Sequence, residues 1–232
     1  MRVFKFGGAS VKDADAVKNV VNVLQEVGYA DTLLVISAMG KTTNAMEKVV
    51  ESYFNDKDGV NASIQEVVDY HNGILSDLFQ NPSHPVYAKV KVLFEEVKGF
   101  LAWNKSPKYA FVYDQVVCYG ELLSTTIVSA YLNEIGISNE WLDVRTLIKT
   151  DNSNRDAQVN WERTQQEVQS RVDVSKLNIT QGFLGSDDNN FTTTLGREGS
   201  DYSAAILAYC CVNWIVKSST FHCSNPESSV ID

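Results

Sequence analysis

The chain has 232 residues, of which 44% are hydrophobic, and it carries a formal net charge of −9. This length and composition exclude disorder throughout and allow one large domain with a sizeable core. The negative charge argues against a nucleic-acid surface and against an anionic membrane, because long-range repulsion opposes both, so an anionic substrate would need local positive charge.

A strand, a pair of glycines and a helix open the chain. The stretch "VFKFGGAS" indicates a short β-strand that the adjacent glycines end. Apolar residues at helical spacing follow from Val11 to Gly28, with Ser10 or Asp13 as the N-cap. Because glycine leaves the backbone uncovered, this layout can hold a phosphate, although similar turns also occur without a ligand.

The next strand ends in a loop rich in hydroxyl groups. "TLLVIS" is almost continuously apolar, which is typical of a strand buried on both faces of a parallel sheet. The loop "SAMGKTTN" contains Gly-Lys-Thr, but Val35 stands where a Walker A motif needs its first glycine, so a P-loop is excluded. Hydroxyls such as those of Ser37 and Thr43 suit a carboxylate or a phosphate, whereas capping of the next helix explains Thr43 without a ligand.

Helical spacing dominates the middle of the chain. Helices are predicted over residues 45–53, 60–80, 85–103 and 116–136. The prolines of "NPSHP" separate the second from the third, and these two form an inserted helical hairpin. "ISNEWLDV" and "LNITQGFLG" are predicted strands, with a further helix in the polar connection from Thr150 to Val172. This order predicts an α/β fold, a three-layer sandwich with a mostly parallel sheet and ligands at the carboxyl ends of its strands.

Two further loops carry charged residues at helix starts. In "YGELLS", Glu121 lies in the first turn of an apolar helix, where an acid commonly serves the helix dipole; a functional Glu121 would bind a cationic group such as a substrate amine. In "TTTLGREGSDYSAA", Arg197 lies among glycines, and the planar fork of arginine grips a carboxylate. Ser200 would suffice as an N-cap, and Asp201 could orient a lysine or a metal.

Other residue types exclude several protein classes. The four cysteines show neither CxxC nor zinc spacing, the histidines lie outside any hydrolase motif, and the N-terminus lacks a secretion signal. No apolar run approaches the length of a membrane span, about 20 residues. A cytoplasmic protein with reduced thiols is expected, and the stretch 218–232 is predicted as coil.

Four separated motifs together resemble one family. "KFGGAS", "VISAMGKTTN", "YGELLST" and "TQGFLG" followed by "TTTLGREGSDYSAAILA" resemble, in order, the signatures of aspartokinases, members of the amino acid kinase superfamily. The resemblance spans about Arg2 to Ala208. It implies transfer of the γ-phosphoryl group of ATP, with Mg²⁺, to the side-chain carboxylate of L-aspartate, the first step toward lysine, threonine and methionine. L-Aspartate and ATP are the implied partners, and a homo-oligomer remains open.

The resemblance also implies a role for each motif residue. Lys5 neutralises charge on the transferring phosphoryl group, and Asp201 orients that lysine. The implied phosphate-binding residues are Gly7, Gly8, Ala9 and Ser10. The implied aspartate-binding residues are Ser37, Thr43, Glu121, Arg197 and Ser200, with Glu121 toward the amino group and Arg197 toward a carboxylate. No residue is assigned to a metal held by the protein, and no general base is needed because the nucleophile is already ionised.

The chain departs from the family after Tyr209. Ala9 stands where threonine is frequent and Glu198 where a second glycine is, and the sequence after Tyr209 matches none of the nucleotide-holding segments or regulatory ACT domains. We expect a catalytic domain over 1–209, incomplete at its nucleotide-binding end, with a helical insertion at about 60–103, a divergent tail over 210–232 and no ACT domains. Missing strands would expose a sheet edge and favour weak stability or association.

Two other functional hypotheses remain at this point. The chain could be a non-catalytic fragment that binds aspartate or associates with a complete kinase subunit. Alternatively, the fold could serve another acceptor, since glutamate, acetylglutamate and uridylate kinases share the glycine loops of the superfamily. The segments "GREGSD" and "YGELLS" argue against these acceptors, because they match the aspartate branch.

Overall fold

The computed structural model describes the backbone of residues 1–219 and the side chains of residues 1–211. Four parallel strands form the main sheet, in the order β1-β2-β4-β3. They are β1 (Arg2–Phe6), β2 (Thr32–Ile36), β3 (Glu140–Leu142) and β4 (Asn178–Gln181). A second, antiparallel pair consists of β5 (Leu184–Ser186) and β6 (Thr192–Thr194).

Eight helices and three short 3-10 turns connect and cover these strands in the described part of the chain. The helices are α1 (Ala14–Val27), α2 (Thr42–Asn55), α3 (Val60–Leu78), α4 (Pro85–Trp103), α5 (Tyr109–Val117), α6 (Tyr119–Glu134), α7 (Trp161–Arg171) and α8 (Gly199–Ser219). The 3-10 turns are η1 (Gly8–Val11), η2 (Lys57–Gly59) and η3 (Val144–Thr146).

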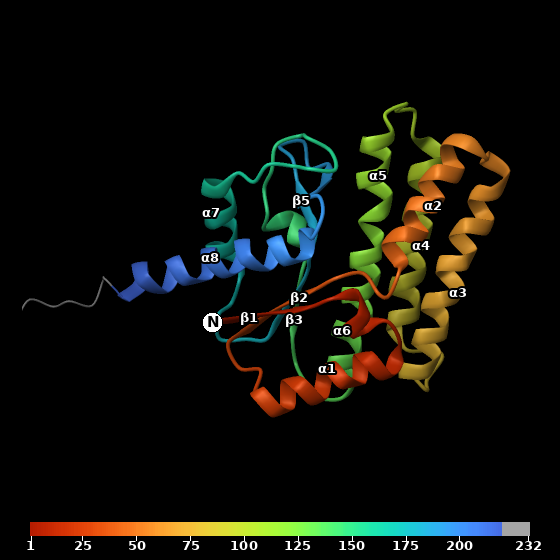
Figure 1. Cartoon of the computed structure of the whole chain (residues 1–232). Helices are drawn as coiled ribbons and strands as arrows, with labels where there is room; N and C mark the ends of the chain where they lie inside the picture. The colour runs from red at the N-terminus through yellow and green to blue at the C-terminus, as the bar shows by residue number, and fades with distance from the viewer. Residues whose placement is uncertain (220–232) are drawn as a thin grey trace, which may run out of the picture.

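Two hydrophobic cores cover the two faces of the sheet. Successive side chains of a strand point to opposite faces. Leu34 and Ile36 of β2 accordingly join the core that contains α1 to α6, whereas Leu33 and Val35 join the core that contains α7 and α8. Helices therefore lie on both faces of a parallel sheet (Figure 1), which confirms the predicted three-layer α/β architecture.

The helical region agrees closely with the pattern of the sequence. α3 and α4 occupy the stretches predicted at 60–80 and 85–103, and they pack with α2, α5 and α6 into a bundle beside the sheet (Figure 1). The single helix predicted over 116–136 is wrong, because the structure divides it at Cys118 into α5 and α6. Cys118 itself keeps right-handed helical angles, with φ −55° and ψ −26°. It is neither glycine nor proline, so the sequence carries no signal of the break.

Two other strand predictions need correction. The strand predicted over "LNITQGFLG" is split into β4 and β5, because Phe183 has a positive φ of 70° that no extended strand contains. β6 lies in a segment expected to be a loop. Residues 218 and 219, predicted as coil, continue α8, and the rest of the predicted coil, 220–232, lies outside the described residues.

β1 is an edge strand of the sheet as far as the structure describes the chain. The N–H of Arg2 donates to a carbonyl just before β2 at 2.8 Å, and the C=O of Phe6 accepts from an N–H just after β2 at 3.0 Å. In a parallel strand both polar groups of a residue point to one side, so the N–H and C=O groups of Val3 and Lys5 point to the outer edge. Separately, within residues 1–219 no helix is long and apolar enough to span a membrane.

Candidate functional site

A cleft of about 450 Å³ lies where β1, β2 and β4 end. Eight residues of the predicted site line it: Lys5, Gly8, Ser37, Thr43, Glu121, Arg197, Ser200 and Asp201. Three other predicted residues, Gly7, Ala9 and Ser10, do not line it, and Ala9 and Ser10 are exposed on η1. The cleft thus gathers residues that lie up to 196 positions apart in the chain.

An ion pair joins the first strand to the last described helix at this cleft. The ammonium of Lys5 lies 3.0 Å from one carboxylate oxygen of Asp201 and 3.1 Å from the other. The Lys5 side chain is 26% exposed and that of Asp201 is 63% exposed, so the pair contributes little to folding stability. Its main effect is geometric, because Asp201 fixes the position of the lysine at the mouth of the cleft.

The loops after β1 and β2 are in direct backbone contact. The N–H of Gly40 donates to the carbonyl oxygen of Gly8 at 3.0 Å. A Cβ atom on Gly8 would lie 2.8 Å from the carbonyl oxygen of Ala38 and 2.9 Å from that of Gly40, so no side chain fits there. Glycine is therefore required at position 8 for the close approach of the two loops.

Glu121 is a buried carboxylate in the floor of the cleft. It lies in the first turn of α6 and is 2% exposed. Its Oε1 accepts a hydrogen bond from the N–H of Ala38 at 3.3 Å, while its Oε2 has no hydrogen-bond partner among the described residues. Burial raises the pKa of Glu121 to about 8, although its backbone hydrogen bonds lower the pKa. A buried acid with one unpaired oxygen in a cleft is typical of a site for a cationic group.

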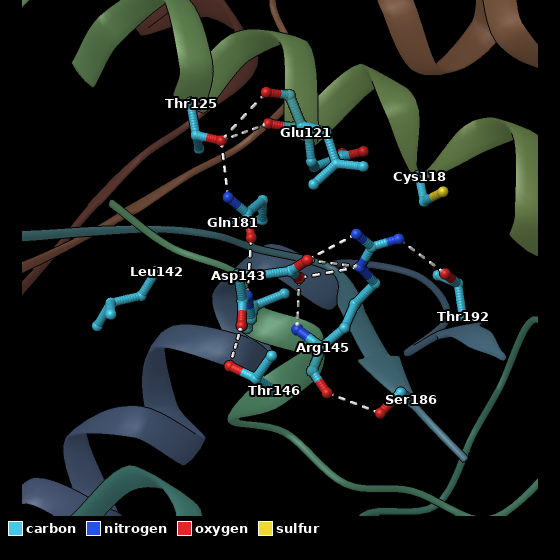
Figure 2. A network of polar contacts seen from close by, with 12 residues as sticks. Cys118, Glu121, Thr125, Leu142, Asp143, Arg145, Thr146, Gln181, Ser186 and Thr192 are labelled. Atoms are coloured by element: carbon cyan, nitrogen blue, oxygen red, sulfur yellow. Dashed lines mark hydrogen bonds and ion pairs between the residues drawn. The ribbon is translucent and has the colours of Figure 1, made fainter. Parts of the chain in front are cut away.

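A polar network behind Glu121 ties α6 to the sheet (Figure 2). The hydroxyl of Thr125 donates to the carbonyl oxygen of Glu121 at 2.9 Å and accepts from the side-chain amide of Gln181 at 2.7 Å. The amide oxygen of Gln181 in turn accepts from the N–H of Val144 at 2.8 Å. These contacts hold the first turn of α6, and with it the Glu121 side chain, against β4.

Neither Thr43, which lines the cleft, nor Ser10, which lies outside it, caps a helix. α2 begins at Thr42 after Lys41, which makes no side-chain capping hydrogen bond, so capping does not account for Thr43. Ser10 does not cap α1 either, because Asp13 takes that position and accepts from the N–H of Ala16 at 2.8 Å.

Close backbone approach also positions the start of α8. A Cβ atom on Gly182 would lie 2.6 Å from the Cβ of Ser200, and one on Gly199 would lie 2.6 Å from the ring of Phe183. These two glycines allow the first turn of α8 to pack on the turn after β4. Arg197 reaches the cleft from the same region, just after Gly196, which has a φ of 78°.

Strained backbone conformations cluster around the cleft. Three of the five non-glycine residues with a positive φ in the described part line it: Arg155, Phe183 and Glu198. Such conformations are uncommon and concentrate at functional sites. The sequence reasoning missed Arg155 and Phe183, and it also missed Tyr113, which lines the cleft from α5. Only the turn-forming residues of "DNSNRD" hinted at an irregular backbone around Arg155.

Acidic residues do not form a metal cage in the described part of the chain. No group of three histidine, cysteine, aspartate or glutamate side chains is gathered there. Mg²⁺ that is carried by nucleotide phosphates needs only one or two carboxylates from the protein, since it keeps several waters. Asp201, on the rim of the cleft, is compatible with that mode of binding.

Known proteins resemble this chain over most of its length. "Lysine-sensitive aspartokinase 3" of Escherichia coli (strain K12) is 30% identical over 224 residues, covering 89% of this chain and 45% of that protein. "Bifunctional aspartokinase/homoserine dehydrogenase 2, chloroplastic" of Arabidopsis thaliana is 27% identical over 216 residues, covering 88% of this chain and 23% of that protein. The chain thus spans less than half the length of either relative.

Solved structures of aspartokinases resemble this chain in fold. Aspartokinase III of Escherichia coli in complex with aspartate and ADP has a TM-score of 0.82 at 28% identity, covering 91% of this chain and 47% of that one. The aspartate kinase of Clostridium acetobutylicum has a TM-score of 0.72 at 22% identity, covering 90% of this chain and 45% of that one, and supports the fold alone. Residues 1–212 match the amino acid kinase family. The chain therefore belongs to the amino acid kinase family and is homologous to aspartokinases.

Proposed function

We propose that this chain carries the acceptor site of an aspartate kinase, which transfers the γ-phosphoryl group of ATP to the side-chain carboxylate of L-aspartate. The observation that carries the proposal is the unpaired, buried Oε2 of Glu121 in a cleft that also holds Arg197 and the Lys5–Asp201 pair. The solved relative that binds aspartate and ADP supports the same acceptor and nucleotide.

The charges of the cleft match those of an amino acid acceptor. In the proposed complex, Glu121 accepts hydrogen bonds from the substrate ammonium, and Arg197 binds the carboxylate that does not react. The hydroxyls of Ser37, Thr43 and Ser200, which line the same cleft, complete the polar surface around the substrate. The reacting carboxylate is ionised at neutral pH and needs no general base, so orientation and charge neutralisation carry the catalysis.

The phosphoryl group is proposed to lie at the opposite end of the cleft. Lys5, held by Asp201, neutralises negative charge there, and backbone N–H groups of Gly8, which lines the cleft, and of the preceding Gly7 contact the phosphates. Mg²⁺, when bound to ATP, supplies further positive charge on the phosphate oxygens. We also propose a cytoplasmic location, since the buried thiols of Cys118, Cys210 and Cys211 are free, as in a reducing compartment.

ATP-dependent formation of aspartyl hydroxamate by the purified chain tests this function. We expect activity with L-aspartate, none with L-glutamate, and loss of activity in Lys5→Ala and in Asp201→Ala. Lys18→Ala is the matched control, because it removes a surface lysine of α1 that pairs with Asp15 outside the cleft. A folded chain that binds aspartate in calorimetry but makes no hydroxamate would contradict the kinase function and support a non-catalytic, aspartate-binding fragment.

A further inference from the structure

Arg155 is a second arginine in the cleft, and neither the fold nor the proposed roles account for it. It belongs to the connection between η3 and α7, and its side chain lines the same cleft as Glu121 and Arg197. Its guanidinium carbon lies 4.3 Å from the centroid of the Tyr113 ring, and one of its nitrogens lies 3.6 Å from Glu47. The stacking fixes the plane of the guanidinium against α5.

These contacts leave hydrogen-bond donors of Arg155 available. A guanidinium carries five N–H donors. Its side chain makes one ion pair and no hydrogen bond with any residue that the structure describes, and it is 46% exposed. An arginine that lies against an aromatic ring and lines a cleft is suited to bind a planar anion such as a carboxylate.

The backbone at this position favours glycine. Arg155 has a φ of 70°, a left-handed conformation that costs a residue with a side chain about 1–2 kcal/mol. Asp114, which is fully buried, maintains it. One oxygen of Asp114 accepts from the N–H of Arg155 at 3.2 Å and from the side chain of Asn154 at 2.9 Å, and the other accepts from Thr194 at 2.8 Å. The strain is consistent with a function that requires the arginine side chain.

The same loop is in contact with the segment that carries Arg197. The N–H of Ala157 donates to the carbonyl oxygen of Thr194 at 3.0 Å. A Cβ atom on Gly196 would lie 3.0 Å from Asp156 and 3.4 Å from the carbonyl oxygen of Arg155, so the two loops touch just before Arg197. The two arginines are therefore presented from adjoining loops to one cleft, where an anion between them would offset their repulsion.

We propose that Arg155 binds, together with Arg197, the carboxylate of the acceptor that does not react, and thereby selects an amino acid with two carboxylates. This inference rests on the proposed function, because it takes the acceptor to be L-aspartate. The two arginines then face the carboxylate that does not react and Glu121 faces the ammonium of the substrate, while Lys5 remains for the phosphoryl group.

The alternative is a purely structural role, in which Arg155 closes the cleft by joining Glu47 of α2. Two substitutions separate the roles. Arg155→Asn removes the guanidinium and keeps a residue that tolerates a positive φ. Glu47→Gln removes the charge of the ion-pair partner and leaves Arg155 in place. A structural link would be lost in both variants, whereas carboxylate binding would be lost only in Arg155→Asn.

The test is an NMR titration of the purified chain with L-aspartate and with its α-amide, L-isoasparagine, which has the same shape but no charge at the α-carboxylate. We expect Arg155→Asn to reduce the preference for L-aspartate over the amide by about 10- to 100-fold. Arg155→Lys restores part of the preference, Glu47→Gln keeps it, and affinity for the amide stays within about twofold. Thermal unfolding of Arg155→Asn should match that of the wild type.

The outcomes separate this inference from the proposed function. An unchanged preference in Arg155→Asn, or an equal loss in Glu47→Gln, would overturn the role of Arg155 while the kinase assay stands on its own result. A preference that depends on Arg155 in a chain without kinase activity would support the inference and contradict only the phosphoryl transfer. If the wild-type chain bound no L-aspartate, both the role of Arg155 and the acceptor assignment would fail.

Discussion

Burial of the Glu121 carboxyl group in the cleft lowers the stability of the folded chain at neutral and higher pH. Its pKa is raised to about 8 by burial, while the unfolded chain titrates near the ordinary value of 4.5. The folded chain therefore retains a proton that the unfolded chain releases between these pH values, so the free energy of unfolding falls as the pH rises through this range. Folding alone would favour an uncharged residue at position 121.

Replacement of Glu121 by glutamine tests whether this one carboxyl group makes the stability of the chain depend on pH. We expect the wild type to lose more stability than Glu121→Gln between pH 5 and pH 8.5, by an amount on the order of a few kcal/mol. Urea denaturation at both pH values measures the difference, with Glu26→Gln on the exposed side of α1 as the control. Equal pH dependence in wild type and Glu121→Gln would show that the buried carboxyl is not what makes stability depend on pH.

Residues of the cleft differ in how far the sequence predicts them. Lys5, Glu121 and Arg197 belong to motifs in which a charged residue stands beside glycines or at a helix start, and the structure brings them to one cleft. Arg155 lies in a polar connection without periodicity. Its place in the cleft depends on contacts with Asp114, which is 41 residues away, and such a distant contact leaves no local pattern.

Element boundaries follow the sequence where side-chain spacing and prolines determine them. α3 and α4 lie close to their predicted ranges, because apolar residues recur every three or four positions and "NPSHP" separates them. The turn at Phe183 was missed because it depends on a positive φ that tertiary packing imposes, and the break at Cys118 was missed because that residue keeps helical angles and has no residue-type signal. The need for glycine at positions 182 and 199 could not be predicted either, because the neighbouring atoms that exclude a side chain there are known only from the packed structure.

The loops after β1 and β2 lie so close together that a side chain at position 8 should destabilise the fold. Gly8→Ala places a Cβ atom against two backbone carbonyl oxygens that cannot move independently of β2. We expect it to lower the free energy of unfolding by about 1–3 kcal/mol. Gly7→Ala is the matched control, because its Cβ would meet only the flexible end of Lys5, at 3.4 Å, and should be nearly neutral. Chemical denaturation compares the two, and similar stabilities would contradict the close packing of the loops.

Across the whole molecule, charge is distributed unevenly. The chain has a net charge of −9, yet one cleft is lined by as many basic as acidic residues: Lys5, Arg155 and Arg197 beside Glu121, Glu198 and Asp201. At physiological ionic strength the Debye length is about 8 Å, so charges beyond the cleft are largely screened while those within it still act on a ligand. An acidic protein can therefore bind two anions, provided that its cations are gathered at the ends of the strands.

At the scale of the whole molecule, we expect the outer edge of β1 to make copies of the chain associate in solution. The N–H and C=O groups of Val3 and Lys5 point away from β2, and edges of this kind pair with other chains. We predict concentration-dependent self-association in sedimentation velocity. Val3→Pro should reduce it, because proline removes an N–H that points outward and is tolerated on an edge strand.

Phe4→Pro is the informative comparison for this edge. Its N–H points toward β2, so proline there removes a hydrogen bond within the sheet and should destabilise the fold by about 3 kcal/mol or more. Val3→Pro should cost less and unfold in a single transition, because the pairing of β1 with β2 stays intact. If Val3→Pro sedimented like the wild type at every concentration, association would have to occur through another surface, and the outer edge of β1 would not be the site where copies of the chain meet.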